Sequence, residues 1–239
     1  MAVDDKDQVM ISTTASPSPR IATPPPVGLV GQRTERLLKL KSRIAKPGEA
    51  SFFFFDAHFK SEAVKILPGE YFVFDEDILI MTTLGSCIAT CLWDRQARIG
   101  GMNHFMLPDN AGGGTDSGRY GSFAMELLIN EMMKMGASRM TMEAKVFGGG
   151  AVISGMNTIN VGERNTEFVM EYLKTERIPV VSKDVLDIYP RKVCFLPHSG
   201  KAMVKRLAPS NPDAIIQQDR LAAQKVAPVS SGGGSIDLF

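Results

Sequence analysis

The chain has 239 residues, of which 44% are hydrophobic and 22% charged, a composition typical of a globular protein with a sizeable core. Its 27 Lys and Arg residues balance 26 Asp and Glu residues, and the net charge of +1 argues against nucleic acid as a partner. Three cysteines build no disulfide framework, no apolar run reaches the roughly 18 residues of a membrane span, and the start is no secretion signal, so we expect a cytoplasmic protein with no integral membrane segment.

The two ends of the chain differ in composition from the middle. Residues 1–49 are predicted to be a flexible tail, because TTASPSPRIATPPPVG buries too little apolar surface to offset chain entropy. Within this tail, RTERLLKLKSRIAK predicts a short basic helix that packs lightly on the domain. Residues 208–239 form a second predicted flexible tail, in which AIIQQDRLAAQKVA has the pattern of a short helix. One domain, residues 50–207, lies between the tails.

The first half of the domain has the pattern of consecutive strands. FFFFD, at residues 52–56, predicts a buried strand. EYFVFDEDILIMTTLGSCIATCLWD predicts two strands, of which the first is interrupted at residues 75–77 and the second alternates from Ile88. A polar turn, DRQARIGG, leads to a further strand, MNHFML, which Pro108 ends. DNAGGGTDSG, at residues 109–118, predicts a long flexible loop.

The second half mixes helices with strands. Apolar residues repeat at helical spacing from Tyr120, and Gly136 supplies a stop. The next segments predict a strand (SRMTMEAKVFGGG), a helix (NVGERNTEFVMEYLKTE), a strand (IPVVSKDV) and a hairpin (RKVCFLPHSGKAMVKRL). Locally paired strands with only two long helices predict an α+β domain, in which the helices cover a largely antiparallel sheet system. The chain order is not a regular β-α-β alternation, which argues against a Rossmann-type sheet.

Two kinds of ligand site find no support in the sequence. The glycine runs at 112–114 and 148–150 match neither a P-loop nor the GxGxxG spacing, so we expect them to serve loop flexibility or close backbone approach. CxxC, HExxH and acidic metal-binding loops are lacking, and Cys87 and Cys91 on one strand would lie about 13 Å apart. We therefore expect neither a nucleotide nor a metal ion.

Cys87 and His104 are the candidates for nucleophilic chemistry. A thiol has a pKa of about 8.5 and needs a nearby base to ionise at neutral pH. Gly85 and Ser86 would let the backbone turn, so that the sulfur is exposed and amide N–H groups converge on an oxyanion. The 17-residue spacing suits two neighbouring strands. The residues alone leave two hypotheses open, a catalytic pair or a core cysteine with a structural histidine.

The remaining cysteines and histidines carry less chemistry. Cys91 and Cys194 lie in apolar alternating runs and are predicted core residues. His58 and His198 are predicted to lie at the surface or to support a site from outside it.

Six motifs resemble one family. ILPGEYFV, LGSCIATCLWD, GGMNHFMLP, GRYGSFAMELLINEM, EAKVFGGG and NVGERN together, within residues 62–207, are similar to CheD, the chemoreceptor glutamine deamidase of bacterial chemotaxis. The resemblance implies a cytoplasmic protein-glutamine glutaminase that hydrolyses glutamine side-chain amides on the cytoplasmic helices of methyl-accepting chemotaxis receptors. The implied fold is a layered α/β/β arrangement.

The resemblance also implies roles for individual residues. Cys87 falls on the family's nucleophile and His104 on its general base, with backbone N–H groups around Ser86 as the oxyanion site and no metal or organic cofactor. A threonine that orients the histidine stands six residues before the cysteine in some members. That position is Met81 here, so the neighbouring Thr82 and Thr83 become the candidates.

Two alternatives to this function stay open at the level of the sequence. The family implies a complex with a CheC-type phosphatase, so the chain could be a binding module that mainly stimulates that phosphatase. A cysteine hydrolase of other specificity, such as a peptidase or methylesterase, is disfavoured because CGSCW-like signatures are lacking.

Overall fold

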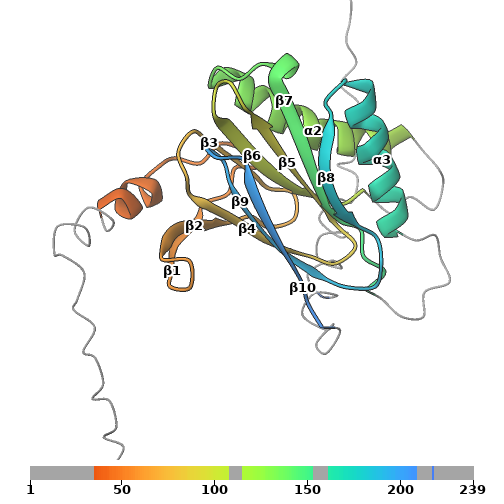
Figure 1. Ribbon diagram of the computed structural model, residues 1–239, viewed down its shortest axis with the longest axis horizontal. Helices are drawn as coiled ribbons and strands as arrows, with labels where there is room; N and C mark the ends of the chain where they lie inside the picture. The colour runs from red at the N-terminus through yellow and green to blue at the C-terminus, as the bar shows by residue number, and fades with distance from the viewer. Residues whose placement is uncertain (1–34, 108–114, 153–160, 209–216, 218–239) are drawn as a thin grey trace, which may run out of the picture.

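The computed structural model describes residues 35–107, 115–152, 161–208 and 217 (Figure 1). The predicted tails therefore lie largely outside the described residues, as does the first part of the predicted loop at 109–118. Within the described parts of the chain, no helix combines the length and apolar character needed to cross a membrane.

Two five-stranded sheets are formed by the described residues. The outer sheet has the strand order β1-β2-β4-β9-β10 and consists of β1 (Phe52–Asp56), β2 (Ser61–Lys65), β4 (Leu79–Leu84), β9 (Arg191–Leu196) and β10 (Lys201–Arg206). The central sheet has the order β3-β6-β5-β7-β8 and consists of β3 (Tyr71–Phe74), β6 (Ile99–Phe105), β5 (Ile88–Asp94), β7 (Met142–Gly148) and β8 (Val180–Val185). Neighbouring strands are antiparallel except β2 with β4 and β7 with β8.

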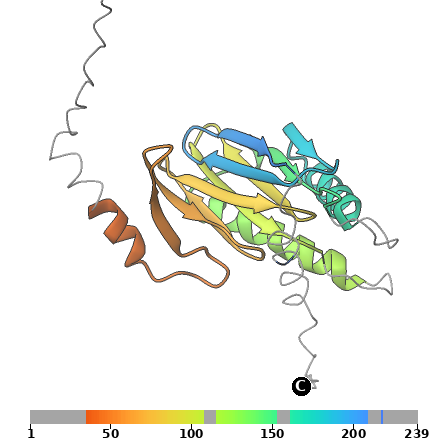
Figure 2. The same ribbon diagram turned by 90° about the horizontal axis from the view of Figure 1, so that it is seen from below.

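The helices lie on one face of the central sheet. The two long helices are α2 (Thr115–Lys134) and α3 (Val161–Thr175), and η1 (Arg139–Thr141) is a short 3-10 turn before β7. Figures 1 and 2 show α2 and α3 together on the side of the central sheet that faces away from the outer sheet. A further helix at residues 35–41, here called the N-terminal helix, packs through Leu40 against the core between the sheets. The predicted layered α+β fold, with largely antiparallel sheets, is confirmed.

The middle strands β5 and β6 of the central sheet are buried on both faces, which explains their uninterrupted apolar character. Along β5, Ile88 and Leu92 face α2 and α3, whereas Ala89 and Cys91 face the outer sheet. All seven residues of β6 are buried. Because successive strand residues point to opposite faces, one strand contributes to two hydrophobic layers. These layers determine which side chains of β5 and β6 can meet.

Two predicted strand assignments are wrong in part. The segment predicted as two strands forms three, because β3 belongs to the central sheet and β4 to the outer sheet. The acidic residues 75–77 carry the chain from one sheet to the other, and the Asp77 carboxylate accepts hydrogen bonds from the backbone N–H groups of His198 and Ser199. FFFFD does form β1, but Phe52 is 60% exposed and only Phe53 is buried among its four phenylalanines, because β1 is an edge strand.

The helix boundaries also differ from the prediction at one end. Helix α2 begins at Thr115, so residues 115–118 are not part of a loop. The predicted stop is confirmed, since Gly136 follows the helix with a φ of 105°. The predicted hairpin is confirmed as the antiparallel pair of β9 and β10.

Candidate active site

Cys87 lies where the chain passes from the outer sheet into the central sheet. It follows Gly85 and Ser86 after the end of β4 and directly precedes β5. Its side chain belongs to the core between the two sheets, on the same face as Ala89 and Cys91. The residue is fully buried, so the prediction that its sulfur is exposed is wrong. The residue is buried because it directly precedes β5, a strand that is covered on both faces.

His104 lies on the neighbouring strand and on the same face. It pairs with Ala89 across β5 and β6, and its alternate neighbours Met102 and Met106 belong to the core between the sheets. Cys87 is two residues from Ala89, so it stands one diagonal step from His104. Diagonal neighbours in an antiparallel pair have Cα atoms about 7–8 Å apart, within reach of long side chains. His104 lies in β6, whereas Cys87 lies one residue before the neighbouring strand β5, so the predicted pair of strands is present but Cys87 precedes its strand.

Thr82 contacts the imidazole of His104 from the opposite sheet. Its Oγ1 lies 2.8 Å from Nδ1 of His104 and donates a hydrogen bond to the carbonyl oxygen of Ile66 at 2.9 Å. Since the hydroxyl donates its hydrogen bond to Ile66, Oγ1 of Thr82 accepts a hydrogen bond from Nδ1–H of His104. The other ring nitrogen, Nε2, then carries the lone pair. Nε2 is buried and has no hydrogen-bond partner among the described residues.

Strand alternation separates the two threonine candidates. Thr82 lies in β4 between Ile80 and Leu84 of the inter-sheet core, whereas Met81 packs in a cluster on the other face of the outer sheet. Thr83 shares the face of Met81, because residues two apart point the same way. Only Thr82 of the pair is placed against the imidazole.

Burial controls the charge of the site. Desolvation lowers the pKa of His104 to about 3, and the Ile66 carbonyl opposes this shift. The imidazole is therefore neutral at neutral pH, the form that accepts a proton.

Burial raises the pKa of the Tyr120 phenol, and its proximity to Cys87 raises it further. Tyr120 and His104 both line a cavity of about 180 Å³ beside α2, and the sequence had marked Tyr120 only as a helix-packing residue.

The glycine run at the end of β7 lies directly against the Cys87 backbone. The N–H of Gly149 donates to the carbonyl oxygen of Cys87 at 2.8 Å, and the N–H of Gly150 donates to that of Gly85 at 2.9 Å. Gly148 has a φ of 114°, and a Cβ atom there would lie 2.1 Å from the Cys87 carbonyl oxygen. Only glycine allows this approach, so the predicted close backbone contact is confirmed for residues 148–150.

The other predicted site residues lie as follows. Ser86 is buried, and its carbonyl oxygen accepts a hydrogen bond from the side chain of Asn165, which the sequence had not singled out. Cys91 and Cys194 are buried core residues, and burial raises the pKa of both thiols. His58 is exposed. Nδ1 of His198 lies 2.7 Å from the backbone oxygen of Asp75, at the turn between β3 and β4.

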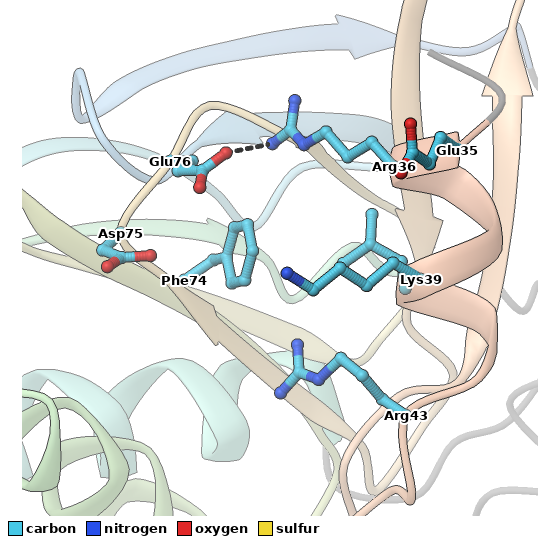
Figure 3. A pocket seen from close by; sticks show the side chains of 8 residues that line it. Glu35, Arg36, Lys39, Arg43, Phe74, Asp75 and Glu76 are labelled. Carbon is cyan, nitrogen blue, oxygen red and sulfur yellow. Dashed lines mark ion pairs between the residues drawn. The ribbon is translucent and has the colours of Figure 1, made fainter. Parts of the chain in front are cut away.

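A second hollow, of about 550 Å³, separates the N-terminal helix from the turn after β3. Figure 3 shows Lys39 of the N-terminal helix and Arg43, which follows the helix, pointing toward Phe74. An ion pair joins Arg36 and Glu76. In this ion pair, Nη2 of Arg36 lies 3.0 Å from Oε2 of Glu76. Neither a cysteine nor a histidine is among its described lining residues, so the hollow offers neither a thiol nor an imidazole.

Comparison with known proteins identifies relatives of this chain. A family model described as CheD chemotactic sensory transduction matches residues 106–206, a segment that begins after both Cys87 and His104. A probable chemoreceptor glutamine deamidase CheD 1 from Albidiferax ferrireducens is 60% identical over 215 residues, covering 90% of this chain and 91% of the relative. A protein of the same name from Dechloromonas aromatica is 52% identical over 192 residues, 78% of this chain and 93% of the relative.

The similarity extends to further bacteria. A probable chemoreceptor glutamine deamidase CheD from Burkholderia mallei is 50% identical over 183 residues, which are 75% of this chain and 78% of the relative. Identities of this size over most of both chains indicate common descent and a common fold. The chain belongs to the CheD family.

Proposed function

We propose that the chain is a chemoreceptor glutamine deamidase that hydrolyses glutamine side chains of chemotaxis receptors to glutamate and ammonia. The observation that supports the proposal is that Thr82 contacts His104 between the two sheets, on the face of the central sheet that also holds the side chain of Cys87. An acceptor nitrogen, Nε2 of His104, faces away from Thr82 on the face that also holds the thiol. The names of the relatives supply the substrate class.

In the proposed first half-reaction, Nε2 of His104 takes the proton of the Cys87 thiol. The thiolate forms a C–S bond with the amide carbon, and the carbonyl π electrons move to oxygen, where backbone N–H groups near Ser86 stabilise the oxyanion. The oxyanion then collapses and the C–N bond breaks. The imidazolium returns the proton to the departing nitrogen, so ammonia leaves and a thioester remains.

The second half-reaction regenerates the free protein. Water attacks the thioester carbon while Nε2 of His104 takes one of its protons, and the C–S bond then breaks. Glutamate leaves, and the thiolate of Cys87 recovers its proton from the imidazolium. No atom outside the protein, the glutamine side chain and water is used, so the chemistry needs no cofactor.

The low pKa of His104 constrains how the thiolate arises. Burial disfavours an isolated imidazolium as it disfavours an isolated thiolate, so neither charge is stable alone. A charge pair formed between the two side chains is compensated by their mutual attraction at short distance. We therefore expect proton transfer to be coupled to substrate attack, with Thr82 holding the imidazole in place throughout.

The proposed substrate is a helical surface. Each conversion adds one negative charge to a receptor helix and changes the repulsion between neighbouring helices, which alters the balance of signalling states. The reaction is proposed to occur in the cytoplasm. A CheC-type phosphatase remains a predicted partner.

Incubation of a purified receptor cytoplasmic domain with the protein tests the function. We expect ammonia release and a mass increase of about one dalton for each converted glutamine. Cys87→Ala should abolish both while its circular dichroism spectrum stays that of the parent protein. Cys91→Ala is the matched control, since it removes a second buried thiol four residues further along the chain, from the same inter-sheet core.

The outcomes separate cleanly. Ammonia release by Cys87→Ala at the parent rate would remove the nucleophile from the proposal. Failure of the unmodified protein to change the mass of any receptor domain would remove the function itself.

A further inference from the structure

Asn165, on α3, joins the two strand ends that carry Cys87 and His104. The residue is fully buried. Its Nδ2 donates to the carbonyl oxygen of Ser86 at 2.9 Å, and its Oδ1 accepts from the backbone N–H of Leu107 at 3.0 Å. One side-chain amide therefore bridges the residue before Cys87 and the third residue after His104.

The bridge occupies the place of a missing rung of the β5–β6 ladder. The observed register ends at Ile88 opposite Phe105, so Ser86 would next oppose Leu107 two residues further on. The carbonyl of Cys87 is directed to β7, because it accepts the N–H of Gly149. Backbone groups alternate sides along a strand, so the carbonyl of Ser86 is directed toward β6.

The same alternation holds on β6. Both the N–H and the carbonyl oxygen of His104 bond to the segment before β3, through Glu70 and Gly69. The backbone N–H of Leu107, an odd number of residues away, is thus directed toward β5. A direct bond from Leu107 to Ser86 would close the ladder. Instead, the Asn165 side-chain amide accepts a hydrogen bond from the N–H of Leu107 and donates one to the carbonyl oxygen of Ser86.

The inserted amide sets the separation of the strand ends. A direct rung would hold the Leu107 nitrogen and the Ser86 oxygen about 2.9 Å apart, whereas two hydrogen bonds through an amide widen this to roughly 5 Å. The position of Asn165 is itself fixed, because the first turns of α3 pack on the glycine run. A Cβ atom at Gly162 would lie 2.2 Å from the carbonyl oxygen of Gly149.

We propose that Asn165 is a positioning residue for the deamidation reaction: its amide keeps β5 and β6 from closing beside Cys87 and thereby fixes the distance from the thiol to His104. This inference rests on the proposed function. Asn165 acts through the backbone and touches neither the substrate nor the reacting atoms. A misplacement of about 1 Å at a reacting group costs roughly 100-fold in rate.

Two variants of Asn165 test the proposal. Asn165→Ala removes the bridge and lets the Leu107 N–H reach the Ser86 oxygen directly. Asn165→Asp keeps the volume and the acceptor for Leu107 but turns a carboxylate oxygen toward the Ser86 carbonyl, and it remains informative if the alanine variant does not fold. Each should lower kcat on a receptor domain by about 10- to 100-fold with KM within about threefold of the parent value.

A second readout needs no receptor. The rate at which iodoacetamide alkylates Cys87 is followed by peptide mass against pH. Because Cys87 is fully buried, the rate itself also depends on access to the sulfur, so the midpoint of the pH profile is what reports the ionisation of the thiol. We expect the midpoint of this profile to move in both variants, upward in Asn165→Asp because a carboxylate disfavours a nearby thiolate. A merely structural residue would lower the melting temperature and leave the profile of the folded protein unchanged.

Asp94→Ala is the matched control. Asp94 ends β5 at its far end, is buried, and accepts hydrogen bonds from the backbone N–H groups of Gln96, Ala97 and Ser138. Its loss should lower the melting temperature and leave kcat and the alkylation profile within about twofold of the parent values, since it lies about 23 Å from Cys87 at ~3.3 Å per residue along the strand.

The proposal is overturned if both Asn165 variants keep the parent kcat and alkylation profile, or if Asp94→Ala loses kcat to the same degree. Should the parent protein deamidate no receptor, the proposed function fails separately. The alkylation profiles then still decide the role of Asn165.

Discussion

Exchange of His104 for glutamine probes the burial of the imidazole. In the folded protein the pKa of His104 is lowered to about 3, whereas an unfolded histidine titrates near 6.5. Between these values the unfolded chain binds a proton that the folded chain does not. The contribution of His104 to the free energy of unfolding is thus fully present above pH 6.5 and is lost as the pH falls toward 3.

The magnitude follows from the separation of the two pKa values. At pH 4.5 the unfolded imidazole is about two pH units below its pKa and the folded one is still neutral, so the loss is about 2 to 3 kcal/mol. His104→Gln does not titrate and can still hydrogen bond with the Thr82 hydroxyl. The drop in unfolding free energy from pH 7 to pH 4.5 should be smaller in the variant by this amount.

Urea unfolding at the two pH values measures the difference, with the fluorescence of Trp93, the single tryptophan, as the probe. Carboxylates that titrate in both proteins cancel in the comparison. His58→Gln is the control, because its ring is exposed. If the imidazole were instead solvated in the folded protein, its pKa would stay near 6.5 in both states. The parent protein and the variant would then lose the same stability on acidification, which would refute the argument.

Three further substitutions follow from the geometry. Thr82→Val removes the hydroxyl beside the imidazole and should lower kcat on a receptor domain about 10- to 100-fold, while Thr83→Val on the opposite strand face changes it less than about twofold. Gly148→Ala should cost roughly 2 to 4 kcal/mol in urea unfolding, because its methyl group would meet a carbonyl oxygen at 2.1 Å. Arg191→Met should cost about 3 to 5 kcal/mol, since loss of the fully buried guanidinium removes the donor to two carbonyl oxygens and leaves the Asp184 carboxylate with Arg206.

Periodicity was sufficient for most elements and insufficient for their assignment to sheets. The alternation around Ile88 and the helical spacing from Tyr120 both predicted elements that the structure contains. The acidic turn after β3 also interrupts the pattern, but a local pattern carries no information on whether the next strand rejoins the same sheet. Four consecutive phenylalanines hide the period of two, so the exposure of Phe52 could not be inferred.

The candidate site also combines features that local spacing predicts with features that depend on how distant elements pack. The spacing of Cys87 and His104 on neighbouring strands was accessible from the sequence, because a short polar turn joins them. The choice between Thr82 and Thr83 was not, since it depends on how the outer sheet is placed over the central one. Asn165 follows Cys87 by 78 residues, and a helix residue that completes a strand ladder leaves no local signal.

The central claim is that the sulfur of Cys87 forms a covalent bond to a glutamine side chain of the receptor. Rapid acid quenching of the protein with a receptor domain, followed by peptide mass spectrometry, tests it directly. We expect a thioester-linked pair of peptides that is about 17 Da lighter than their sum, with the link at Cys87. Deamidation without any such link, or a link at Cys91, would contradict the account.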